Sequence, residues 1–118
     1  MPSSPSSDAQ NTYLTAIEAA YALIENNFDQ AYDRCSSDKQ KATLRGVHAA
    51  ARDAYFRGVA SMLRDNSPFV VEVYQELAAA NEQLKKLTSN LQNIDSFLQM
   101  AKQAVKLAAS LVTLASAI

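Results

Sequence analysis

The sequence predicts an all-α protein in which an antiparallel helical hairpin packs on a long third helix. Apolar residues recur at steps of three and four along most of the chain, as on one face of an α-helix. Only two Gly and three Pro occur in 118 residues, and this scarcity argues against a turn-rich β fold. Helix-capping patterns mark the expected helix starts. The length fits one domain.

The chain begins with a polar segment, residues 1–7, that is rich in Ser and Pro and is expected to be a disordered tail. The single helical domain is expected to cover 8–118. The tail has neither the positive charge nor the apolar run of a secretory signal, so we expect a cytoplasmic protein. Non-classical export through the Ser-rich start is the alternative.

The first helix is expected to start near Ser7, because Ser7 and Gln10 have the spacing of a capping box. The helix should run to about residue 35. Its apolar residues follow the helical spacing: Leu14, Ile17, Tyr21, Ile24, Phe28, Ala31 and Cys35.

The second helix is expected between Ser37, which forms another capping box with Gln40, and about Arg64. Small residues recur at every fourth position on one flank and predict a close helix–helix contact; they are Gly46, Ala50, Ala54 and Gly58. Basic residues on another flank form a candidate docking strip for an acidic partner: Lys41, Arg45, His48 and Arg52. Alternatively, this strip faces the acidic flank of the first helix, and the attraction between the two flanks favours the antiparallel pairing of the two helices.

The third helix is expected to follow Ser67 and Pro68, because Pro is well tolerated at the first helical position. An unbroken three-four spacing of apolar residues then runs to the end of the chain. Cap-forming residues cluster near 88–96, where a break would give an up-down four-helix bundle. We favour one continuous helix, because Leu91 and Ile94 keep the apolar spacing through this region.

A continuous helix of this length would span about 75 Å, whereas the hairpin would reach only about 40 Å. Its second half would need another surface. We therefore predict a non-catalytic protein–protein interaction protein that acts through self-association or partner binding by its apolar C-terminal helix. The expected partner is a second copy or another protein. The predicted interaction residues are Leu84, Leu87, Leu91, Ile94, Leu98, Val105, Leu111 and Val112.

The alternative function is that of a membrane-active or exported helical protein. In that case the segment 97–118 would insert into a bilayer or lie on it, since its last twelve residues carry no charge. We do not favour this reading, because Lys102 and Lys106 would have to enter the bilayer.

Several classes of function lack a sequence signature. A net charge of −1 gives no indication of nucleic-acid binding. The single Cys35 cannot form an intramolecular disulfide, and with His48 as the single His it cannot complete a zinc site. No Gly-rich phosphate loop and no nucleophile–base spacing occur. We therefore expect no enzyme, no cofactor, and no catalytic, cofactor-binding or metal-ligating residue.

Overall fold

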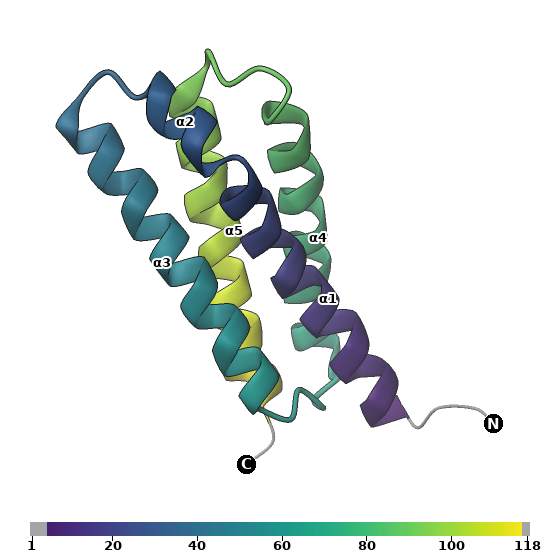
Figure 1. Cartoon of the computed structure of the whole chain (residues 1–118). Helices are drawn as coiled ribbons and strands as arrows, with labels where there is room; N and C mark the ends of the chain where they lie inside the picture. The colour runs from purple at the N-terminus through teal and green to yellow at the C-terminus, as the bar shows by residue number, and fades with distance from the viewer. Residues whose placement is uncertain (1–4, 117–118) are drawn as a thin grey trace.

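The computed structural model describes the backbone of residues 5–116 and the side chains of residues 11–116. The predicted all-α class is confirmed (Figure 1). Within the described residues, the single feature of β type is an isolated bridge between Leu63 and Ser116. The helices are α1 (Pro5–Asn26), α2 (Phe28–Arg34), α3 (Asp38–Ala60), α4 (Pro68–Leu87) and α5 (Ile94–Ala115).

The favoured prediction of one continuous helix after Pro68 is wrong, and the alternative of a break near residues 88–96 is right. Helix α4 ends at Leu87 because the hydroxyls of Thr88 and Ser89 bond to its last carbonyls. Thr88 donates to Lys85 O at 2.6 Å, and Ser89 donates to Lys86 O at 2.7 Å. Such local bonds compete with helix continuation.

The apolar spacing passes through this turn for a reason that sequence reasoning missed. Leu91 lies in the turn and Ile94 opens α5, yet each is only 7% exposed. The turn closes one end of the bundle, so its apolar side chains face the core as those of the helices do. A loop that covers a core end needs apolar residues as much as a helix face does.

The bundle consists of two antiparallel hairpins, α1 with α3 and α4 with α5 (Figure 1). Helix α5 packs against α1, α3 and α4, whereas α3 and α4 lie at opposite corners. The connection 61–67 must therefore cross the end of the bundle diagonally. Leu63 in this connection is fully buried, and the backbone N–H of Arg64 donates to Ala115 O at 2.8 Å. This bond pairs one of the free carbonyls at the end of α5.

The predicted first helix is divided in two at Asn27. The Asn27 side chain donates from Nδ2 to Leu23 O at 2.7 Å, a back-bond that interrupts regular helix geometry. Helix α1 begins at Pro5, so the last three residues of the predicted tail are helical, and residues 1–4 lie outside the described residues. The predicted Ser7 cap concerns a side chain outside the described set.

The predicted starts of the second and third helices are confirmed. Gln40 N donates to Ser37 Oγ at 3.1 Å, and Gln40 Oε1 accepts from Ser36 N at 2.6 Å. Pro68 opens α4, as expected. Helix α3, however, ends at Ala60 and not near Arg64, because the crossing connection begins there.

One polar side chain lies in the core between α1 and α4. Asn81 is 8% exposed, and its Nδ2 donates to Ala16 O at 2.9 Å. Its Oδ1 has no hydrogen-bond partner among the described residues. A buried polar side chain of this kind fixes the alignment of two helices at some cost in stability.

Candidate functional site

The predicted interaction residues do not form a surface. Seven of the eight are buried in the core of a single chain, and Leu87 is half-buried against it. The reversal after α4 folds the two halves of the apolar seam onto α1 and α3 and onto each other. The expectation that they form an exposed contact surface is therefore corrected. The membrane-active alternative depends on the same region, and no helix in residues 5–116 is long and apolar enough to cross a membrane.

The candidate docking strip lies along the side of α3 that meets α1 and α2, and several of its residues contact those helices. His48 Nε2 is 2.5 Å from Glu25 Oε2, and since an ionised carboxylate only accepts, Nε2 carries the proton. Arg45 donates to the Tyr32 hydroxyl at 3.4 Å, and Lys41 Nζ lies 5.4 Å from the centre of the same ring. The contacts agree with the interpretation that the strip selects the hairpin.

Aromatic rings fill the contact of α1 and α2 with α3. The sequence placed Tyr21 and Phe28 on the packed side of the first helix but did not predict these ring contacts. The ring of Tyr21 stacks on Tyr55 at a centroid distance of 5.7 Å and lies 6.1 Å from His48. The ring centroid of Phe28 lies 4.9 Å from that of His48. The sequence held a signal, because Tyr21 and Phe28 are seven residues apart, and so are His48 and Tyr55. Residues seven apart share a helix face.

The ionisable groups of this contact shift one another's pKa values. Hydrogen bonds from His48 and then from Tyr21 hold the pKa of the Glu25 carboxyl below its ordinary value. Partial burial, followed by the hydrogen bond to Glu25, raises the pKa of the Tyr21 hydroxyl. Each shift favours the hydrogen-bonded pair and thereby the hairpin. The arrangement is that of a structural network that joins two helices.

The thiol of Cys35 lies at the end of α2 and is 8% exposed. Its Sγ donates to Ala31 O at 3.3 Å, and burial raises the pKa of the thiol. Both effects disfavour the reactive thiolate. Among residues 11–116, no group of three His, Cys, Asp or Glu side chains is placed to hold a metal ion.

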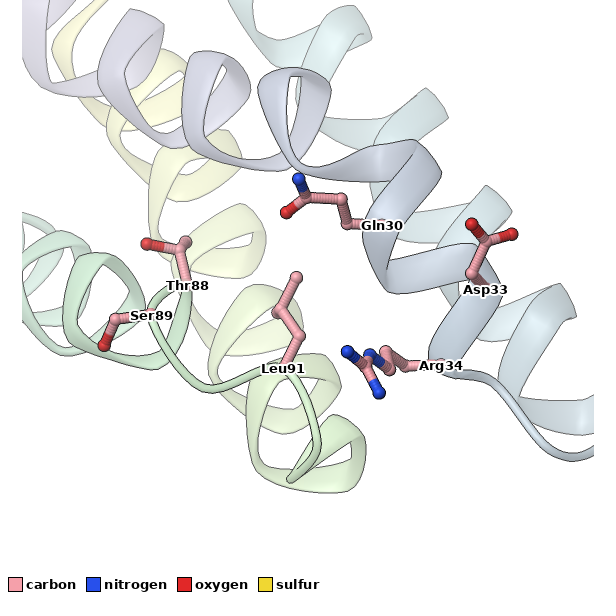
Figure 2. A pocket seen from close by; sticks show the side chains of 6 residues that line it. All are labelled: Gln30, Asp33, Arg34, Thr88, Ser89 and Leu91. Atoms are coloured by element: carbon pink, nitrogen blue, oxygen red, sulfur yellow. The ribbon is translucent and has the colours of Figure 1, made fainter.

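A polar pocket of about 450 Å³ opens between α2 and the turn after α4 (Figure 2). Gln30 and Arg34 point from α2 towards the turn, and Asp33 points away. The hydroxyls of Thr88 and Ser89 donate to the backbone of α4. Arg34 is thus the one cationic side chain that lines the pocket. One guanidinium and one amide side chain do not by themselves define a ligand.

The large exposed apolar side chains of the described residues gather at the opposite end of the bundle. We call them the end patch: Phe56, Val59, Met62, Phe69 and Leu114, with exposures between 38% and 62%. They belong to the last turns of α3 and α5, the connection 61–67 and the start of α4. This is the end where α1 begins and α5 ends (Figure 1).

A groove of about 820 Å³ runs over the outward side of α5, between the edges of α3 and α4. Gly46 and Ala50 line it from α3, Glu76 from α4, and Lys106 and Leu107 from α5. The small residues predicted to form one contact on α3 therefore lie in different surroundings. Gly58 packs tightly, with Leu14 Cδ1 3.2 Å from the position of an added Cβ, whereas such an atom on Gly46 would meet nothing within 4 Å.

Comparison of the chain with known protein families, with curated proteins and with solved structures finds no match.

Proposed function

We propose that this protein is a non-catalytic interaction protein that acts by protein–protein contact, either with a second copy of itself or with another protein. The observation that carries the proposal is the end patch. Five large apolar side chains are exposed at one end of the bundle, whereas the other large apolar side chains of the described residues are buried in the core or half-buried against it.

Exposed apolar side chains are common when they are scattered, but a group of them at one end of a small domain is typical of a contact surface. Phe56 and Phe69 are each more than half exposed, and Met62 lies on the connection between their helices. Full burial of one such side chain contributes about 1.5–3 kcal/mol. A partner that covers the end patch would therefore gain a substantial part of a typical binding free energy.

The C-terminal helix supports the same proposal in a different way from that expected from sequence. Its seam is used inside the chain, but α5 also carries Met100, Leu107 and Leu114 on its outward side. These side chains are half-buried or exposed and lie seven residues apart. A contact by the C-terminal helix would thus use this outward side.

Site-specific photo-crosslinking in the source cell tests the proposal. A benzophenone amino acid would replace Phe56 or Phe69 in the full chain, one position at a time. Gln75, an exposed polar residue in the middle of α4, is the matched control position. We expect a protein adduct from the end-patch positions and none from the control. Equal adducts at all three positions, or no adduct at Phe56 and Phe69, would show that the end patch is not a contact surface and would remove the observation that carries the proposal.

A further inference from the structure

The outward side of α5 carries a second three-four pattern, which we call the outer seam: Met100, Gln103, Leu107, Ser110 and Leu114. Gln103 and Leu114 are exposed, and the other three are half-buried. Three-four spacing is what a helix needs to meet one other helix along its length. The seam that faces the core already meets α1, α3 and α4, whereas the outer seam is only partly covered within the described residues.

The surface beside the outer seam leaves room for a second helical layer. Gly46 and Ala50 on α3 are exposed, and the space above Gly46 is open to 4 Å. On the other edge, Ala79 of α4 is also exposed. Small side chains on both edges let the backbone of another helix approach closely.

The charges along the groove make the surface complementary to itself. Lys102 and Lys106 lie on the α3 side of α5, whereas Glu76 lies on the α4 edge. None of these three has an ion-pair partner among the described residues. A two-fold axis parallel to α5 would set the α4 edge of one copy over the lysines of the other. An antiparallel arrangement would set lysines over lysines.

The face around the outer seam is also large enough for a stable interface. The molecule measures 49 Å along the helices and 24 Å across them, whereas a stable interface takes roughly 800 Å² from each partner. Resting on the function proposed above, the geometry points to a parallel two-fold homodimer in which the α5 helices meet along their outer seams. Glu76 of each copy then pairs with Lys106 of the other. Gln103 lies opposite its own counterpart, where two amides can bond to each other and fix the register.

Disulfide trapping tests this geometry directly. In a Cys35→Ser background, Gln103→Cys and Ser110→Cys are made separately, and the full chain is oxidised. A parallel two-fold axis along the seam brings each residue close to its own copy, so both variants should form covalent dimers. An antiparallel pair could trap at most one of them. Gln75→Cys, on α4 but outside the groove-lining residues, is the control and should stay monomeric. Trapping at one position only, at none, or equally at the control overturns the proposal.

Sedimentation velocity across a dilution series tests the contacts. Leu107→Glu should give a monomer that remains folded in dilute solution, because Leu107 is only half-buried in the single chain. Lys106→Glu and Glu76→Lys should each weaken the dimer by about tenfold, and the double variant should recover most of the loss. If the single variants weaken the dimer and the double variant does not recover its affinity, the proposed pairing of Glu76 with Lys106 is wrong.

The two proposals can fail separately. If the wild-type chain is a monomer at every concentration but Phe69 crosslinks to a different protein, the dimer is wrong and the interaction function stands. If the chain is a monomer and the end patch gives no adduct, both are wrong.

Discussion

The two glycines of α3 should respond in opposite ways to the same substitution, Gly→Ala. Both lie inside one helix, and neither has a positive φ. At Gly46 an added Cβ meets nothing within 4 Å. At Gly58 it would lie 3.2 Å from Leu14 Cδ1, and further side chains from α5 and α1 lie at 3.6 and 3.7 Å, respectively. The effect of Ala on the helix backbone is thus the same at both positions, and only the space around the added methyl group differs.

The expected magnitudes follow from these distances. Ala is favoured over Gly in a helix interior by about 0.5–1 kcal/mol, so Gly46→Ala should raise the free energy of unfolding by that amount. Gly58→Ala has the same local gain but overpacks the core, which costs about 1–3 kcal/mol. The contact at 3.2 Å is with a side-chain methyl of half-buried Leu14, which can move only partly. We expect a net loss of up to about 2 kcal/mol at Gly58.

Chemical denaturation and thermal melting measure both variants, at a concentration where the chain is monomeric. A chain of this size shifts its melting temperature by about 4 °C for each kcal/mol. Gly46→Ala should therefore melt several degrees above Gly58→Ala. If Gly58→Ala were as stable as Gly46→Ala or more so, the tight approach of α1 to α3 at Gly58 would be wrong.

Three further variants test the fold and the α1–α3 contact. Leu98→Ala should lower the free energy of unfolding, measured by chemical denaturation, by about 2–5 kcal/mol, because Leu98 is in the core. Gln99→Ala, at an exposed position, should change it by less than about 0.5 kcal/mol. Equal effects of the two variants would contradict the closed core. Asn81→Asp should melt lower than wild type at neutral pH and recover on acidification as the buried carboxyl protonates; a melting temperature independent of pH would contradict this. Glu25→Gln should remove stability that is present above pH 4.5 and is lost as the pH falls through the lowered pKa of Glu25 in the fold. Urea midpoints across this range measure the loss, and a difference from wild type that persists to the most acidic pH would contradict it.

Features that depend on neighbours in the sequence could be predicted. The all-α class, the cap at Ser37 and the start of α4 at Pro68 are all present. Each follows from interactions between residues a few positions apart, such as a hydroxyl that accepts from the backbone N–H three residues later. The apolar residues that follow the three-four spacing between Val70 and Ala115 are mostly buried, as such a pattern predicts, but they lie on two helices and are covered within one chain.

The turn at 88–93 shows where sequence reasoning stopped being sufficient. The cap-forming residues predicted a break and the apolar spacing predicted continuity, and the two signals have comparable local strength. The break prevails because α5, once reversed, packs against three helices at once. A straight helix would have left half of the seam without cover. The choice depends on a long-range gain that no local pattern contains.

The candidate sites changed for the same reason. Four small residues spaced by four on α3 look equivalent in sequence, but each step of four turns the helix by 40°. Gly58 therefore reaches the core, while Gly46 lies over the open groove. Likewise, the outer seam of α5 can be recognised as a candidate contact surface only when the other face of that helix is known to be covered.

The sequence by itself determined that the chain is helical, where α3 and α4 begin, and which residues are apolar enough to be buried. The tertiary structure alone decided which apolar residues cover one another and which stay exposed. The physical reason is range: caps and propensities act within one or two helical turns, whereas the direction of a hairpin is set by apolar area buried between segments far apart in the chain.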